Sequence, residues 1–349
     1  MVLDSPDGLT PSPCRAGKIA THMSVLFGSL RRRLFGITPG ATSFESRGFR
    51  GGTPDIRSRL EEVGRAFTLG YHAALAAPNP ELLPEFIAQG PKAFRGFAYE
   101  GAGMGLALVD WMTPWSRTRL TRFLSGAGDA HVYMVHVGAG WVLARVPGNV
   151  DRFLSRFDPL LRWLLIDGYG FHEGYFNWAA YLGGAPAPSR LKGYARRVFD
   201  QGLGRCLWFI DGAEVRRITQ TIAGFPAPRQ ADLWSGIGLA SVYAGEISEE
   251  DLHLLRAAAG DFLPQLSQGA AFAAKARQRA GNLSPYQDLA CGILCGMTAS
   301  EAARVTDDVL ENLPNDGPEP AYETWRQRTQ EAISRMPRSQ PPRVPEVIR

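Results

Sequence analysis

The chain is poor in cysteine, in lysine and in long apolar runs, and each shortage excludes a class of protein. Its four cysteines, at positions 14, 206, 291 and 295, have neither zinc-ligand nor redox spacing. We therefore expect small apolar helix residues in a reducing compartment. The longest nearly uncharged run, 130–144, is shorter than the roughly 20 residues that a membrane-spanning helix needs.

The excess of one sign of charge over the other is also small. The net charge is only +4 over 349 residues, which argues against a nucleic-acid-binding protein. The composition, 45% hydrophobic and 21% charged, is that of a globular protein whose core needs no disulfide or metal. Residues 1–22 lack the apolar segment of a secretory signal. These features predict a cytoplasmic protein.

Standard catalytic motifs are missing as well. The sequence contains no Gly-x-Ser-x-Gly elbow and no His-Glu-x-x-His metal motif. His136, His172 and Glu173 would hold a metal only if the fold brought them together, so we predict no metal site. The sequence does not indicate which cofactor is used, so the cofactor is unknown.

Apolar spacing indicates a mainly α fold. Leu60, Val63, Phe67 and Tyr71 follow the three-and-four spacing of a helix face. Ser248 is a predicted N-cap, and Thr298-Ala-Ser-Glu301 matches a capping box. We predict further helices over 23–37, 82–88, 268–279 and 322–336.

Glycines 101, 103 and 105 lie in an apolar stretch that suggests a phosphate-binding loop. No Lys-Ser or Lys-Thr pair follows them, and no convincing strand precedes them. A helix face of small residues, which lets another helix pack closely, is the favoured interpretation.

An ordered series of similar segments predicts an internal duplication. Gly103-Met-Gly-Leu-Ala107 matches Gly236-Ile-Gly-Leu-Ala240, and Leu165-Ile-Asp-Gly168 matches Ile293-Leu-Cys-Gly296. We expect two pseudo-repeats that pack around an apolar cleft. In chain order we predict a disordered extension over 1–22, a helix and connection over 23–57, the first pseudo-repeat over 58–182, a linker over 183–203, the second pseudo-repeat over 204–312, and a helix with a disordered tail over 313–349.

The stretch 164–176 carries the densest chemistry. An apolar run breaks at Asp167-Gly168, and His172 and Glu173 follow. His172 is the candidate for proton transfer, with Glu173 or Asp167 to orient it. A buried, hydrogen-bonded turn between two helices is the alternative interpretation.

Other polar and aromatic residues are candidates for the walls of a binding pocket. Both pseudo-repeats contribute, since duplicated halves commonly form a site at their interface. The candidates are Tyr99, Glu100, His136, Tyr169 and Tyr175 from the first pseudo-repeat, and Arg205, Trp208, Asp232 and Trp234 from the second.

Several long motifs resemble one family. They are Leu30-Arg-Arg-Arg-Leu-Phe-Gly-Ile37, Arg95-Gly-Phe-Ala-Tyr-Glu-Gly101, Asp167-Gly-Tyr-Gly-Phe-His-Glu-Gly-Tyr-Phe176, Gly204-Arg-x-Leu-Trp-Phe209 and Asp232-Leu-Trp-Ser-Gly236. They look like the UnbL-type family of enediyne polyketide gene clusters, over about residues 30–308. That family has no proven reaction, so the resemblance supplies no catalytic residues.

The resemblance implies a role in maturing a linear polyene into the enediyne core. It also implies UnbV-type and membrane-bound UnbU-type proteins as partners. In one hypothesis the chain acts on a hydrophobic polyene in an aromatic cleft. In the other it is a non-catalytic binder that shields the chain or links the synthase to the membrane partner through Arg31–Arg33, at the inner face of the membrane.

Overall fold

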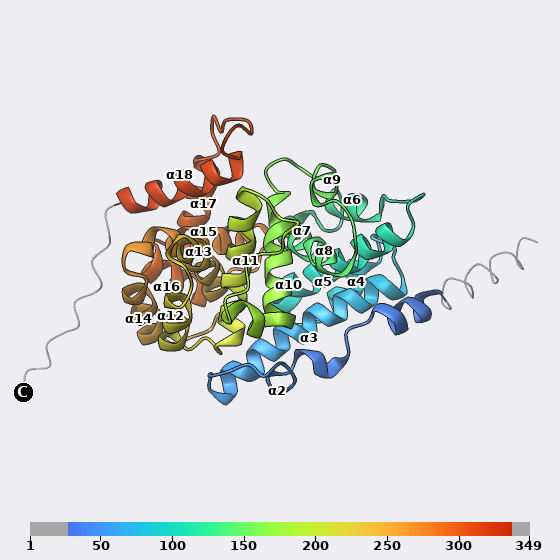
Figure 1. Ribbon diagram of the computed structural model, residues 1–349, viewed down its shortest axis with the longest axis horizontal. Helices are drawn as coiled ribbons and strands as arrows, with labels where there is room; N and C mark the ends of the chain where they lie inside the picture. The colour runs from blue at the N-terminus through green and yellow to red at the C-terminus, as the bar shows by residue number, and fades with distance from the viewer. Residues whose placement is uncertain (1–26, 337–349) are drawn as a thin grey trace, which may run out of the picture.

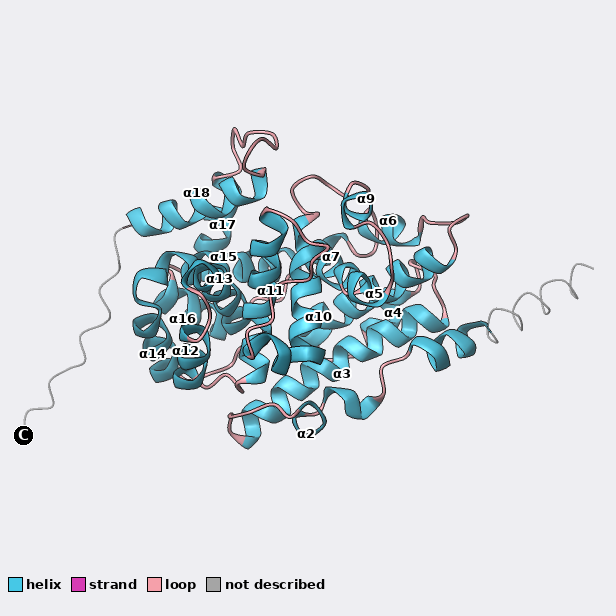
Figure 2. Ribbon diagram, in the orientation of Figure 1, coloured by secondary structure: helices cyan, strands magenta, loops and turns pink. Residues whose placement is uncertain are grey.

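The computed structural model describes residues 27–336, and within that range it contains helices and connections but no β-strand (Figure 2). The predicted mainly α fold is therefore confirmed. The predictions for residues 1–22 and for the tail after residue 336 lie outside the described residues.

A series of helices, each packed mainly on the next, forms the interior. Figure 1 shows the chain crossing from α3 and α5 through the central pair α10 and α11 to α13 and α15. The helices of the series are α3 (Pro54–Ala76), α5 (Arg95–Met112), α7 (Val132–Gly140), α10 (Trp163–Leu182), α11 (Tyr194–Ile210), α13 (Ala227–Tyr243) and α15 (Leu263–Arg279).

Other helices and single turns flank this series. They are a helix over 27–35, α2 (Phe44–Arg47), α4 (Leu83–Ile87), α6 (Arg119–Leu124), α8 (Val142–Arg145), α9 (Val150–Leu154), α12 (Val215–Ala223), α14 (Glu249–Ala259), α16 (Pro285–Leu294), α17 (Ala299–Asp308), α18 (Ala321–Arg335), and the single turns η1 (Pro39–Thr42), η2 (Lys92–Phe94), η3 (Asp129–His131) and η4 (Gly260–Phe262).

Glycines let neighbouring helices of the series approach until backbone meets backbone. A Cβ atom on Gly138 of α7 would lie 1.7 Å from the carbonyl oxygen of Glu100 on α5. On α10 and α11 the contact is reciprocal: Gly170 faces the carbonyl of Phe199, and Gly202 faces that of Asp167. Only glycine leaves room for contacts this close.

The same reciprocal contact recurs at every step of the series. In each pair, the glycine of one helix faces a carbonyl of the other helix. That carbonyl belongs to the residue three positions before the other helix's glycine. The pairs are Gly70 with Gly101, Gly103 with Gly138, Gly140 with Gly168, Gly170 with Gly202, Gly204 with Gly236, and Gly238 with Gly269. Their spacing along the chain lies within the range of about 20–50 residues that is typical of helical repeats.

The last helices of the series, α13 and α15, contact α5 and the turns before α5 and α7. Arg277 of α15 donates to the carbonyl of Ala93 before α5 (2.9 Å), and Arg279 pairs with Asp129 in η3 (2.8 Å). The ring of Tyr243, at the end of α13, packs edge-on against Phe97 of α5 with 5.2 Å between centroids. The helices therefore surround a shared interior.

Several local predictions are confirmed. Leu60, Val63, Phe67 and Tyr71 are buried along α3. Ser248 caps α14, and the Thr298–Glu301 capping box begins α17. The glycines of α5 lie on a closely packed helix, as favoured over a phosphate loop.

The predicted break at Asp167-Gly168 is wrong. Trp163–Leu182 is α10, and its one departure from helical angles is at Asn177. Gly168 lies inside the helix because it faces the carbonyl of Val137 on α7. The glycines of this stretch therefore serve helix packing and not a turn.

Two organisational predictions can be compared with the helices. Within the predicted linker 183–203, α11 begins at Tyr194. Gly168 and Gly296, which the predicted duplication matches, differ in conformation, because Gly168 lies inside α10 whereas Gly296 follows α16 with a φ of +78°. The regularity that the structure shows is a helix-by-helix one, and the duplication into two copies stays an interpretation.

Replacing Gly202 with alanine is expected to destabilise the protein by about 3 kcal/mol or more, because the new Cβ would lie 1.9 Å from the carbonyl oxygen of Asp167. The matched control is Gly292→Ala in α16, where no atom lies within 4 Å of the added Cβ. That variant should gain up to about 1 kcal/mol from helix propensity. Urea unfolding of both variants checks this, and similar effects at the two positions would contradict it.

Candidate functional site

Two apolar cavities lie between the helices of the series. We term the first the aromatic cavity. The space between its side chains is about 570 Å³, which includes open solvent at its edge. A water molecule's centre fits into about 30 Å³ of it. Its lining residues are Ile37, Thr42, Val63, Gly64, Phe67, Phe97, Glu100, Trp141, Phe171, Tyr175, Phe176, Arg205, Phe209, Leu239, Ala240, Tyr243 and Ala244.

The second cavity occupies about 490 Å³ on the same definition and lies toward α15 and α18. It is lined by Met134, Val137, Leu164, Phe272 and Trp325, among others. Arg205, Leu239 and Tyr243 line both cavities. The two spaces therefore adjoin, and together they form an elongated apolar interior with a charged group at its middle.

Three buried charged residues meet at this junction. Arg205 of α11 forms an ion pair with Asp167 of α10, and its other terminal nitrogen lies 4.0 Å from Glu100 of α5. All three side chains are at most 6% exposed. Burial disfavours the charged guanidinium, but Asp167 and Glu100 raise the pKa of Arg205 above its usual value. The arginine is therefore held in its charged form.

Glu100 is the member of this cluster that titrates near neutral pH. Burial raises its pKa to about 7; Arg205 opposes this shift and Asp167 adds to it. Its Oε1 atom is buried, lies 4.0 Å from Arg205 and makes no hydrogen bond of ordinary geometry. Glu100 therefore combines a tuned carboxyl group with a place in the wall of the aromatic cavity, as general acid–base chemistry requires.

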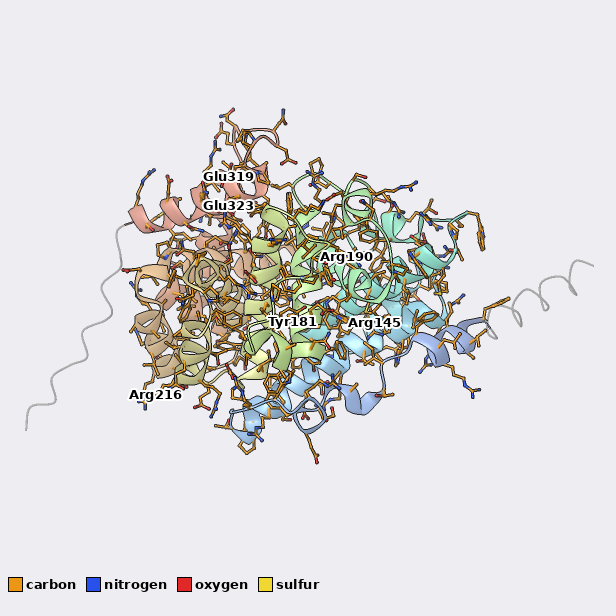
Figure 3. All side chains as sticks on the ribbon, in the orientation of Figure 1. Arg145, Tyr181, Arg190, Arg216, Glu319 and Glu323 are labelled. Carbon is orange, nitrogen blue, oxygen red and sulfur yellow. The ribbon has the colours of Figure 1, made fainter. Side chains whose placement is uncertain are left out.

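A second buried network adjoins the cluster on the side of α18. Gln201 donates to Asp167 (2.8 Å) and to the hydroxyl of Tyr322 (3.2 Å). The next residues of α18 continue the chain of contacts: Arg326 pairs with Glu323 and with Asp232 of α13, both at 2.8 Å. This network fixes α18 (Glu323 is labelled in Figure 3) against α11 and α13.

His172 lies in α10 outside the walls of both cavities. Its Nε2 accepts from Arg145 (3.2 Å; labelled in Figure 3), and its Nδ1 lies 3.5 Å from Glu173. Burial lowers the pKa of His172, against an opposing effect of Glu173. The imidazole is therefore neutral and oriented by its two neighbours. Trp141 and Phe176 separate it from the aromatic cavity.

Glu173 does not cap a helix. It accepts hydrogen bonds from Asn177 (3.1 Å) and Tyr181 (3.0 Å; labelled in Figure 3), within and at the end of α10. Burial would raise the pKa of Glu173, but these bonds and His172 lower it. It is therefore a carboxylate that holds the imidazole in place.

Of the other predicted pocket residues, only Tyr175 lines the aromatic cavity. Its hydroxyl donates to the carbonyl of Thr42 (3.3 Å), which ties the segment before α3 over the cavity. Phe44 and Phe49 anchor that segment, since both are buried. Arg50 pairs with Asp211 at the end of α11 and fixes its far end.

The remaining predicted residues lie elsewhere. Tyr99 stacks on His131 (4.0 Å between centroids), and Tyr169 packs edge-on against Phe199 (5.6 Å). The Nδ1 atom of His136 bonds the carbonyl of Val132 within α7. Trp208 and Trp234 are buried in the core and line neither cavity. The structure therefore brings together Asp167, Glu100, Arg205 and Tyr175 from the predicted set, with Asp232 in the adjoining network.

Sequence reasoning missed Trp141, Tyr243, Gln201 and Arg326. Arg326 had a usable signal, because Glu323 precedes it by one helical turn in a predicted helix. That spacing is also common on exposed helices, whereas Arg326 is 1% exposed. Trp141 follows the Gly-x-Gly pair of α7 directly, but only the contacts across helices show that it faces Glu100.

Neither a metal cluster nor a membrane span is found in residues 27–336. No group of three or more His, Cys, Asp or Glu side chains in that range is arranged to hold an ion. None of the helices in the described part of the chain has both the length and the apolar character needed to cross a membrane.

Comparisons with known proteins give one match. The model of the family described as protein of unknown function DUF1702 matches residues 26–333. Neither the curated proteins nor the solved structures contain a significant match to this chain. The match therefore spans all the helices named above except the last residues of α18.

Glu100→Gln is expected to remove a pH dependence of stability. The pKa of Glu100 rises from a usual 4.5 to about 7 on folding. The folded protein therefore keeps a proton that the unfolded chain releases, and the wild type loses stability as pH rises between these values. Glutamine mimics the protonated acid, so relative to wild type the variant should gain about 1–3 kcal/mol between about pH 5 and about pH 8. Urea unfolding at both pH values measures this, and a pH-independent difference would contradict it.

Proposed function

Because the chain belongs to the DUF1702 family, whose description assigns no activity, we propose its function from its interior: it binds and acts on a linear, unsaturated, hydrophobic small molecule. In agreement with the UnbL-type resemblance, the proposed ligand is a polyene or polyyne intermediate on the way to an enediyne core. UnbV-type and membrane-bound UnbU-type proteins are its proposed partners.

This proposal rests on one observation: the two apolar cavities adjoin at Arg205, Leu239 and Tyr243. Aromatic walls and a small number of placed polar groups are typical of small-molecule sites. The spaces are narrow in this closed form, so the side chains at the edge of the aromatic cavity must move to admit a chain. Phe176 and Leu239 are partly exposed there.

Among the candidates for proton transfer, the geometry favours Glu100 over His172. The Glu100 carboxyl lines the aromatic cavity and has a pKa of about 7. His172 lines neither cavity, and its Nε2 already accepts from Arg145. We therefore assign proton transfer to Glu100. In this proposal the opposite charges of Arg205 and Asp167 balance each other beside it.

A second candidate function is a non-catalytic carrier that docks to a membrane-bound partner. The helix over 27–35 favours it, because Phe27, Leu30 and Leu34 are exposed there beside the exposed Arg32 and Arg33. Exposed apolar side chains next to arginines suit the surface of an anionic membrane. Arg31 is held instead by the carbonyl of Leu75 (2.8 Å).

Ligand binding can be tested with parinaric acid, a conjugated fatty acid whose fluorescence rises in apolar surroundings. Leu239→Trp should fill the junction of the cavities and lower affinity at least about tenfold, whereas Leu239→Ala should retain binding. Leu254→Trp is the matched control, because Leu254 is on the surface (37% exposed). Melting temperatures show whether each variant is folded. Binding that survives Leu239→Trp in a folded protein would place the ligand elsewhere.

Proton transfer can be tested in an enediyne-producing strain that lacks this gene, complemented with variants. Glu100→Gln should lower product formation by about 100-fold or more, the usual contribution of a general acid–base group, and a polyene should accumulate. His172→Ala should retain product, provided that soluble protein levels match wild type. The reverse pattern would move the assignment to His172. Full output from both variants would favour the carrier, and full output without the gene would exclude the pathway.

A further inference from the structure

Three polar atoms at the aromatic cavity lack a hydrogen bond of ordinary geometry: Oε1 of Glu100, the indole nitrogen of Trp141 and the hydroxyl of Tyr243. Each residue is at least nine-tenths buried. Buried polar groups are nearly always paired in folded proteins, so three such atoms around a single space require an explanation.

These three atoms come from different elements and converge on one face of α5. A Cβ on Gly96 would lie 2.0 Å from the Tyr243 hydroxyl, so this hydroxyl sits against Gly96. Glu100 follows Gly96 by one helical turn and therefore shares its face. The indole N–H of Trp141, at the α7–α8 junction, faces the Glu100 carboxyl as a hydrogen-bond donor, and this lowers the pKa of Glu100 against the effect of burial. The three groups thus surround the same end of the cavity.

The chemistry of these groups defines the partner that they would accept. An indole N–H is only a donor, and a tyrosine hydroxyl that faces an acceptor is also a donor. Glu100 donates as well when it carries a proton. Donors grouped at one end of the cavity suit an acceptor such as a carbonyl oxygen.

The charge of the site indicates that this carbonyl is uncharged. Among residues 27–336, Arg205 is the one cation that lines the aromatic cavity, and Asp167 already pairs with it. A carboxylate ligand would lie beside Glu100 with no unpaired cation, and a buried charge without a partner is unfavourable. A ketone, ester or thioester avoids this cost.

The rest of the wall fits an apolar chain. Phe67, Phe97, Phe171 and Phe209 line the cavity away from the polar end. We propose that the aromatic cavity binds an apolar, unsaturated chain that carries an uncharged carbonyl, whose oxygen accepts hydrogen bonds from Trp141, Tyr243 and protonated Glu100. This inference rests on the proposed function and names the ligand class of the same site.

Three fluorescent probes test it: methyl parinarate, parinarate, and diphenylhexatriene, which is conjugated but has no oxygen. At about pH 6, where Glu100 with its pKa of about 7 keeps its proton and the free acid is ionised, the wild type should bind the ester about tenfold more tightly than the acid, because the site has no free cation. Tyr243→Phe should weaken ester binding by about five- to tenfold, the usual effect of one hydrogen bond, and leave diphenylhexatriene binding unchanged.

Tyr175→Phe is the matched control. Tyr175 lines the same cavity, but its hydroxyl already donates to Thr42, so its loss should leave the ratio of ester to diphenylhexatriene affinity unchanged. Tyr243→Phe should not lower the melting temperature, since the hydroxyl it removes is unpaired in the free protein.

Three results would overturn the inference: tighter binding of the acid, an unchanged ratio in Tyr243→Phe, or a lower melting temperature for that variant, which would mean that the hydroxyl holds a buried water. In each case binding of diphenylhexatriene would leave the proposed function intact. If none of the probes binds the wild type, the proposed function itself fails.

Discussion

Backbone carbonyls that rest directly on glycines hold the interior helices together, and the placement of the buried charges depends on these contacts. Side chains normally keep helix axes about 8–10 Å apart. Where Gly138 meets the carbonyl of Glu100, and Gly202 that of Asp167, no side chain intervenes. Contacts of this kind include weak Cα–H to oxygen hydrogen bonds. They fix the orientation of the helices, since neither backbone can shift. Glu100, Asp167 and Arg205 can therefore meet from three separate helices.

The repeated contact also explains where the polar residues lie. The residue whose carbonyl meets the next helix stands three positions before the second glycine of each Gly-x-Gly pair. Along the series this residue is Glu100, Val137, Asp167, Gln201 and Ser235. All but Val137 are polar, and all are buried. Gln201 bonds Asp167, and Ser235 bonds Gln268 on α15 (2.9 Å). One backbone geometry, repeated, thus places a row of polar side chains inside an apolar protein.

Local features of the fold could be predicted from the sequence, because helix faces and caps depend on residues a few positions apart. The stretch 164–176 also proved to hold a member of the buried cluster, Asp167. Its conformation was predicted wrongly because Asp-Gly is typical of turns, and only the carbonyls of α7 and α11 show why glycine is needed within α10. The partners of Asp167 could not be predicted either. Arg205 and Gln201 lie more than thirty positions away in sequence, and no local pattern indicates which arginine among 38 basic residues is buried.

The regular spacing of these glycines affects how the amino-acid sequence of such a chain can diverge during evolution. Interfaces made of backbone atoms place little demand on the identity of the surrounding side chains, whereas each glycine is sterically irreplaceable. Substitutions can therefore accumulate on the helix surfaces and in the cavity walls while the arrangement of the helices persists. Distant members of this family should be recognisable by the interval between glycine pairs when overall identity has faded, and their ligands should differ where the residues between those pairs differ.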